Sequence, residues 1–166
     1  MTKRKQSSPN PVVAVLLACA VPGGGHIYLG RAKRGVIIFL TITALFWSGL
    51  AIGGVMTVDP QNERWWFMAQ MCTGGNGIIA WQRQKKVVER IKKAEGPEEL
   101  EERLVAAKIK LVTPAETVAR AYSGVAGLLN LMCIFDALML ASMGVRGEPA
   151  PQVRKKEELA EKEPAP

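Results

Sequence analysis

Apolar residues along the chain fall into four long segments that are separated by short charged blocks. The segments cover residues 11–30, 35–58, 65–81 and 121–143, and Asp136 is the single carboxylate inside them. Such stretches are too long and too uncharged for the core of a water-soluble protein of this size. The pattern predicts an all-α fold, and more narrowly a small polytopic helical membrane protein.

The first segment is interrupted near its middle. Pro22 removes a backbone donor, and each of the three glycines Gly23–Gly25 costs about 1 kcal/mol relative to alanine in a helix. The apolar run before the break would form about 15 Å of helix, which is half of a bilayer core. The segment therefore either crosses with a kink or enters and returns, and residues 11–58 form a glycine-broken helical hairpin.

The second segment, residues 35–58, is the clearest predicted span because it exceeds the roughly 20 uncharged residues needed to cross a bilayer. It contains Gly49 and Gly53 in a G-x-x-x-G spacing. This spacing either lets another helix approach closely or reflects the general frequency of glycine in membrane helices.

A connector and a weaker third segment occupy residues 59–81. The segment contains the amides Gln70 and Asn76, which would have to face protein or water-filled space. Tryptophans lie at both of its ends, which predicts aromatic belts at two interfaces. These residues are Trp65, Trp66 and Trp81.

Residues 82–113 form the polar block between the third and fourth segments, and they predict two amphipathic helices. The second opens at Pro97, with glutamates near its positive end. The pair either lies along the membrane surface or on the protein, or binds a protein partner. A capping box, Thr113–Glu116, then predicts a long helix over residues 114–143. The predicted ends of the chain are a basic N-terminal tail, 1–10, and a disordered charged tail, 144–166.

The net charge of +7 changes this interpretation little, because the basic residues flank apolar segments. Attraction to anionic lipid explains them better than nucleic acid does, since no base-stacking aromatic pattern accompanies the charge. Positive residues prefer the cytoplasm, which predicts that residues 31–34 and 82–113 share the cytoplasmic side and that residues 59–64 lie outside. The proposed surface anchors are Arg31, Lys33 and Arg34, together with the three tryptophans.

Catalysis and cofactors find no support in the residue pattern. The three cysteines lie in different apolar segments, and the single histidine, His26, has no second histidine as a partner. Ser48 has no base at a recognisable spacing, and Gly23–Gly25 do not fit a phosphate loop. We therefore expect no cofactor, no metal and no enzymatic activity.

The stretch Pro22–Gly30, followed by a basic residue and by Gly35, resembles the signature of the two-transmembrane-helix domain family. It is similar also to small bacterial membrane proteins of unknown function that share a later L-L-N-L-x-x-x-x-D motif, matched here by Leu128–Leu131 and Asp136. The chain departs from the two-helix family in its two additional apolar segments and in Ile27, where an aromatic residue is usual. The resemblance implies a compact helical hairpin in a bacterial membrane and carries no activity.

Asp136 is the first candidate for function, because an ionisable group inside an apolar helix is costly and faces protein or water. It belongs either to an ion or proton path or to a structural pin that joins helices, and Asn130 is offset from it around the helix. His26 either titrates or binds a nearby carbonyl. Further candidates are the residues of the predicted turn and the small-residue face: Gly23, Gly25, Tyr28, Gly30, Gly49 and Gly53.

Three functional hypotheses follow. The first is a structural or interaction module of the bacterial cytoplasmic membrane, whose partners are the lipid bilayer and a protein bound through residues 82–113, and which is compatible with a homo-oligomer. The second is a transport or channel component that uses Asp136. The third is an exported or lipid-anchored protein, since Lys3–Lys5, a short apolar core and an ACA sequence ending at Ala20 also describe a signal peptide.

Overall fold

The computed structural model describes residues 8–60, 63–93, 96–106 and 115–148, and within these ranges the chain is all-helical. The prediction of an all-α fold is confirmed. The helices are α1 (Pro11–Ala20), α2 (Gly24–Tyr28), α3 (Ala32–Gly53), α4 (Arg64–Met71), α5 (Gly75–Lys92), α6 (Pro97–Ala106) and α7 (Glu116–Ser142), with a short 3-10 turn, η1, at Val55–Thr57.

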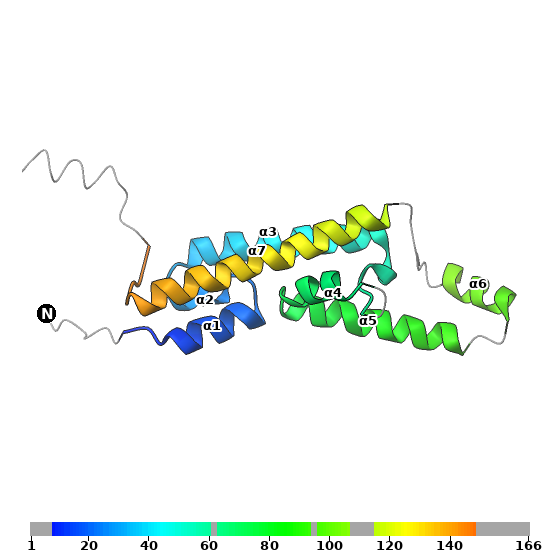
Figure 1. Ribbon diagram of the computed structural model, residues 1–166, viewed down its shortest axis with the longest axis horizontal. Coiled ribbons are helices and arrows are strands. Elements are labelled where there is room, and N and C mark those ends of the chain that lie inside the picture. The colour runs from blue at the N-terminus through cyan, green and yellow to red at the C-terminus, as the bar shows by residue number, and fades with distance from the viewer. Residues whose placement is uncertain (1–7, 61–62, 94–95, 107–114, 149–166) are drawn as a thin grey trace, which may run out of the picture.

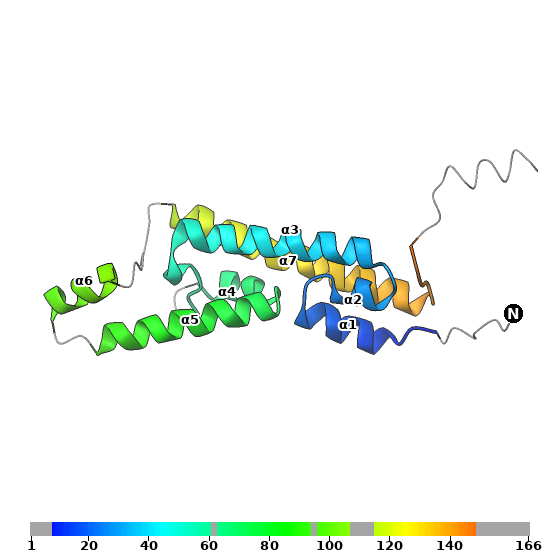
Figure 2. The same ribbon diagram turned by 180° about the vertical axis from the view of Figure 1, so that it is seen from behind.

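Two long helices, α3 and α7, lie side by side and run in opposite directions (Figures 1 and 2). At about 33 and 40 Å, both are long and apolar enough to cross a membrane. Their close approach depends on two glycines of α3. A Cβ atom at Gly49 would lie 2.8 Å from the carbonyl oxygen of Ala119, and one at Gly53 would lie 2.4 Å from the Ala119 Cβ. Any larger residue at these positions would push α7 away.

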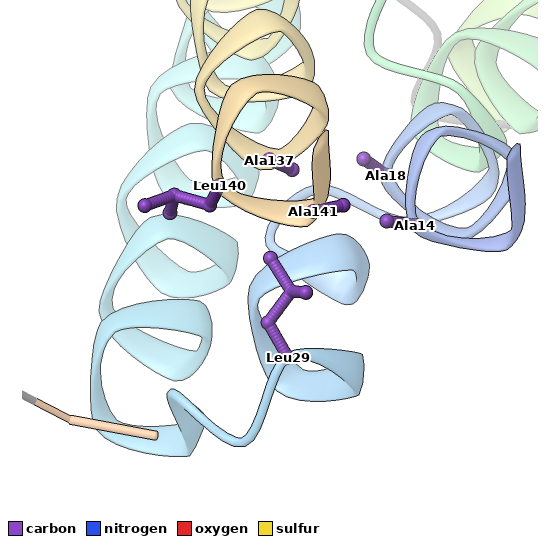
Figure 3. Close-up of a cluster of buried hydrophobic side chains, with 6 residues drawn as sticks. All are labelled: Ala14, Ala18, Leu29, Ala137, Leu140 and Ala141. Carbon is purple, nitrogen blue, oxygen red and sulfur yellow. The ribbon is translucent and has the colours of Figure 1, made fainter. Parts of the chain in front are cut away.

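The first apolar segment forms a helix, a turn and a second short helix, as the break at Pro22 predicts. Asn10 caps α1 by accepting a hydrogen bond from the Val12 amide at 3.0 Å. Gly23 then has a φ of 78°, a conformation that favours glycine, and the chain reverses into α2. Alanine and leucine side chains pack α1 and the end of α2 against the C-terminal half of α7 (Figure 3). This cluster consists of Ala14, Ala18, Leu29, Ala137, Leu140 and Ala141.

The third apolar segment also reverses, and here the structure differs from the predicted single segment over residues 65–81. The chain leaves α4 at Cys72, and Gly74, with a φ of 65°, opens α5. As a consequence Trp81 lies beside the start of the segment rather than at an opposite interface, and its ring is 5.9 Å from that of Phe67. The two predicted aromatic belts are therefore one group, because a reversal returns the chain to the end from which it came.

We call the end of the molecule where α3 begins and α7 ends the Arg34 end, and the opposite end the Glu63 end. Both views place α1 and α2 at the Arg34 end, and α4, α5 and α6 at the Glu63 end (Figures 1 and 2). Residues 31–34 and the charged part of α5 thus lie at opposite ends. The prediction that they share one side of a membrane assumed that the third segment continues in one direction, whereas it reverses at Gly74.

Several predicted boundaries also move. The boundary between residues 81 and 82 falls inside α5, which runs without interruption from its apolar to its charged part. Helix α6 begins at Pro97 as predicted. Thr113 and Pro114 of the predicted capping box lie outside the described residues, as do residues 1–7 and 149–166 of the predicted tails. Within the described residues α7 begins at Glu116, whose carboxylate pairs with Arg120.

Candidate functional site

At the centre of the molecule, the side chain of Asn130 contacts the turns of both helical hairpins. Asn130 is completely buried, and its Nδ2 donates to the carbonyl oxygen of Cys72 at 2.8 Å and to that of Ala18 at 3.3 Å. We call these three residues the amide junction. One side chain of α7 thereby joins the end of α1 to the end of α4.

The sequence explains why these two carbonyl groups need an outside donor. Within a helix the Ala18 carbonyl would accept from the amide four residues later, but that residue is Pro22, which has no N–H. Cys72 is the C-cap of α4, where the final carbonyls also lack partners within the helix. The amide of Asn130 supplies the missing donor to both, at the negative ends of two helix dipoles.

The two hairpins touch each other directly at this junction. A Cβ atom at Gly74 would lie 2.1 Å from the carbonyl oxygen of Cys19, so the turn of one hairpin is packed on the end of the other. Asn130 is near the midpoint of α7, and α1 and α4 approach it from opposite ends of the molecule (Figure 1). The two short helices together measure about 27 Å, close to the thickness of a bilayer core.

A second polar group, which we call the ionic cluster, consists of His26, Arg34 and Asp136. His26 is completely buried, and its Nε2 lies 2.9 Å from Asp136 Oδ2. The Arg34 Nη2 lies 3.1 Å from the same oxygen. One carboxylate therefore joins α2, α3 and α7. Of the two predicted roles of His26, titration or a bond to a nearby carbonyl, the structure shows no carbonyl partner among the described residues. Its Nε2 faces this carboxylate, and its Nδ1 has no hydrogen-bond partner among those residues.

The ionic cluster lies near the Arg34 end rather than at the centre. Asp136 is six residues before the end of α7, or about 9 Å along the helix. Its side chain is 40% exposed and that of Arg34 is 52% exposed. Asp136 is therefore not an isolated charge in the middle of an apolar helix, and the buried polar residue at mid-length is Asn130.

The predicted basic anchors have different surroundings from one another. Lys33 is exposed, whereas Arg31 is largely buried and its Nε donates to the carbonyl oxygen of Gly147 at 3.0 Å. The Gly147 amide in turn donates to the carbonyl oxygen of Leu29, the residue before Gly30. Arg31 thus fixes the segment after α7 to the turn after α2, and a role as a free surface anchor does not fit it.

Tyr28 also contacts protein rather than standing free. Its hydroxyl accepts a hydrogen bond from the Asn10 amide at 3.3 Å, which joins the beginning of α1 to the end of α2. The guanidinium carbon of Arg146 lies 5.7 Å from the centre of its ring. The predicted turn residues therefore close the first hairpin at its open end.

A third buried contact attaches α4 to α7. Gln70 is completely buried, and its Nε2 donates to Ser123 Oγ at 2.8 Å and to the Thr57 carbonyl at 3.1 Å. Glycines allow the helices to meet here, because a Cβ atom at Gly127 would lie 1.7 Å from the Ala69 carbonyl oxygen. Ser123, Gly127 and Gly74 were not predicted from the sequence. The pair Gly74-Gly75 after Thr73 was the available signal, since it repeats the glycine run after Pro22.

The arrangement is suited to holding helices together. Among the described residues no group of three His, Cys, Asp or Glu side chains could hold a metal ion. An open groove of about 250 Å³ lies between α3 and α7 and is lined by apolar atoms of Leu45, Ala121, Tyr122 and Val125. The buried side chains of Asn130, Gln70 and His26 each bind another part of the same chain.

These features define the class to which the chain belongs: all-helical proteins with two helices long enough to cross a membrane and two helical hairpins that meet between the ends of those helices. The family follows from a comparison of sequences. Residues 13–148 match the model of a family of unknown function, DUF6677, and the chain belongs to that family. The comparisons with curated proteins and with solved structures found no match to this chain.

Proposed function

We propose that this chain is an integral protein of the bacterial cytoplasmic membrane and acts as a structural or interaction module. Helices α3 and α7 would cross the bilayer. The hairpins α1–α2 and α4–α5 would enter from opposite surfaces and meet at its middle. The observation that supports this most strongly is the amide junction, because it satisfies backbone carbonyls that could find no water at that depth.

The exposed surface agrees with this placement. Large apolar side chains of α3 and α7 point outward, including Ile37, Leu40, Met132 and Phe135, each of which is more than half exposed. Water would not tolerate so large an apolar surface on a monomer, whereas acyl chains would. The bacterial origin rests on the resemblance of the Pro22–Gly30 stretch to small bacterial membrane proteins.

The proposal retains α1 in the mature protein. Ala14 and Ala18 are buried against α7, and Asn130 binds the Ala18 carbonyl, so cleavage after Ala20 would expose an apolar face and remove one of the two acceptors of that amide. This supports an anchored, uncleaved N-terminal hairpin over an exported or lipid-modified product. Intact-mass measurement of the purified chain tests it, and loss of residues 1–20 would contradict it.

Site-directed labelling tests the crossing pattern. Single cysteines would replace Lys33, Arg64 and Lys93, all of which are exposed, in a chain whose three native cysteines are changed to serine. We expect an impermeant maleimide to reach position 33 from one side of the membrane and positions 64 and 93 from the other. Labelling of 33 and 93 from the same side would contradict two crossings, and recovery of the chain in the aqueous fraction would contradict a membrane protein.

A transport or channel component is the second candidate, favoured by one specific observation. In secondary transporters, the substrate and ion sites usually lie near the middle of the membrane, where two interrupted helices meet. Asp136→Asn distinguishes the two. If the chain is a structural module, the variant keeps its fold, and neither the variant nor the wild type conducts ions. As a transporter, the wild-type chain in liposomes carries a proton or ion flux that the variant loses.

The proposal assigns no reaction to the chain. His26 and Arg34 come from other helices, and both pair with Oδ2 of the Asp136 carboxylate. A partner protein at the Glu63 end would reach α5 and α6, which continue past the ends of α3 and α7 (Figures 1 and 2). Crosslinking through Lys93 and Arg103 in cells tests this, and a chain that yields no reproducible adduct there would contradict an interaction module.

A further inference from the structure

Basic side chains form a row along one side of α5. They follow one another at spacings of three, four and three residues, which places them on the same side of a helix. All of them are exposed, and none pairs with a carboxylate within the described residues. The single carboxylate of this part of α5, Glu89, lies outside the row. We call this row the basic stripe, and it consists of Arg83, Lys86, Arg90 and Lys93.

The basic stripe begins at the bundle and continues beyond it. The guanidinium carbon of Arg83 lies 5.1 Å from the centre of the Trp47 ring on α3, and α5 then extends past the ends of α3 and α7 (Figures 1 and 2). Helix α5 starts at Gly75, beside the amide junction. Along the helix, Arg83 is about 12 Å and Lys93 about 27 Å from that start.

These lengths place most of the stripe outside the hydrocarbon of the proposed membrane. The amide junction lies at mid-membrane in that proposal, and half of a bilayer core is about 15 Å. Because α5 runs in the same general direction as α3 and α7, the stripe leads away from the membrane surface (Figures 1 and 2). Lipid head groups would meet only its first residues, so the stripe as a whole is suited to an acidic protein surface.

Helix α6 of the same chain has such a surface. Glu98, Glu101 and Glu102 are exposed and lie on one face, since they are three and four residues apart. We call these three residues the acidic face. The remaining glutamate of α6, Glu99, pairs with Arg103 of the same helix. Helix α6 makes no extended contact with any other described helix, so its acidic face does not cover the basic stripe of its own chain.

From this complementarity we infer that the basic stripe binds the acidic face of α6 in a second copy of this chain. The inference rests on the proposed role as a membrane interaction module and names its partner. Copies with one orientation in the membrane extend α5 and α6 from the same surface and to the same height. A twofold axis along the membrane normal then gives two identical contacts, each between α5 of one copy and α6 of the other.

The contact depends on charge more than on apolar area. An exposed ion pair contributes little by itself, but complementary rows of charge select a partner, and like charges in the same places exclude it. Both contacts of the dimer change together when one helix is altered, because the twofold axis repeats each of them. Association should also weaken at high salt, since exposed charges are screened.

The test measures association of the full chain in phosphatidylcholine vesicles, which contain no anionic lipid. The three native cysteines are changed to serine, and Lys33→Cys carries a donor or an acceptor dye at the end opposite the contact. Energy transfer between the two labelled populations reports association. We expect wild-type copies to associate, and K86E/R90E/K93E to lower the association constant at least about tenfold, because like charges then face each other. E98K/E101K/E102K should have the same effect.

A mixture of these two variants gives the decisive result. Each altered helix then meets a helix of opposite charge, so the mixture should associate although neither variant does so alone. A mixture that associates no better than its components would overturn the second copy as the partner. The absence of energy transfer above random proximity in the wild type would overturn it as well. Unchanged helical circular dichroism shows that the variants are folded.

The matched control moves the same changes by one residue on α5. K86E/K93E alters the basic stripe, whereas K85E/K92E alters two exposed lysines outside it and should keep most of the association. Equal losses in these two variants would overturn the stripe in favour of diffuse charge attraction. A chain that floats with the vesicles without associating refutes the dimer alone, whereas a chain that stays in the aqueous fraction refutes the membrane proposal with it.

Discussion

The two helical hairpins have the same local design and opposite outcomes. Each reverses at a glycine with a positive φ, Gly23 in one and Gly74 in the other. The returning helix α2 has five residues and ends in a buried contact, whereas α5 has eighteen and continues beyond the bundle (Figure 1). Both hairpins therefore use a glycine turn, and the residues after the turn decide whether the hairpin remains inside the fold or extends out of it.

The difference lies in the polar residues that follow each glycine. In α2 the next polar side chain is His26, which is completely buried and faces Asp136, and Gly30 then stops the helix. In α5 the first polar side chain is Asn76, which remains inside, but Arg83 and the residues beyond it are mostly exposed. The carboxylate of Asp136 on α7 holds the first hairpin through the buried His26, whereas the charged residues of the second hairpin favour solvent or lipid head groups.

The largest effect is expected at the residue that both hairpins share. Asn130→Leu would leave the carbonyls of Ala18 and Cys72 buried without a donor, at about 2 kcal/mol each. Alkylation of the native cysteines Cys19 and Cys72, followed by mass spectrometry, should become faster at both positions. Asn76→Leu serves as the control, since it removes an amide between α3 and α5 and should not change the rate at Cys19. A rise at one cysteine alone would show that the hairpins are independent.

The second hairpin alone should respond to Gly127→Ala. The added methyl would lie 1.7 Å from the Ala69 carbonyl, so α4 must move away from α7. We expect a loss of about 3 kcal/mol, read as a lower melting temperature in detergent together with faster alkylation of Cys72. Gly75→Ala is the control, because it adds the same methyl group at the start of α5. A Cβ atom there would lie 3.4 Å from its nearest neighbour, the carbonyl oxygen of Ala20. Equal melting temperatures of these two variants would contradict the tight packing of α4 on α7.

The first hairpin should respond to Gly25→Ala by a smaller amount. A Cβ atom there would lie 2.6 Å from the Ala14 carbonyl oxygen and 2.9 Å from the Ala137 Cβ, so α2 must shift against α1 and α7. We expect a cost of about 2 kcal/mol and faster alkylation of Cys19, with little change at Cys72. An effect confined to Cys72 would show that the assignment of packing to this hairpin is wrong.

The smallest effect is expected at the ionic cluster. Arg34→Gln removes a pair whose two side chains are about half exposed, and such pairs contribute less than about 1 kcal/mol. Asp136→Leu should cost more, because it leaves the Nε2 of the buried His26 without its acceptor. Thermal unfolding in detergent compares the two variants, and a larger loss for Arg34→Gln would reverse the proposed order.

Much of this fold could be predicted from local sequence because its signals act over a few residues. Pro22 with the glycines after it breaks the first segment, Pro97 opens α6, and a long uncharged run makes α3. The reversal at Gly74 was not predicted, since two glycines in an apolar run are also compatible with a continuous helix in a membrane. That one turn decides at which end of the molecule the charged part of α5 lies.

In the candidate site, too, some features follow from the local sequence and others depend on the tertiary structure. The sequence by itself determined which residues are costly to bury, and so it identified Asp136, Asn130 and His26 as residues that need partners. Only the tertiary structure decided the partners: a carboxylate for His26, two carbonyls for Asn130, and Arg34 for Asp136. The reason is physical, because burial cost is a property of one residue, whereas its relief depends on groups that lie 58 to 112 positions away in the chain.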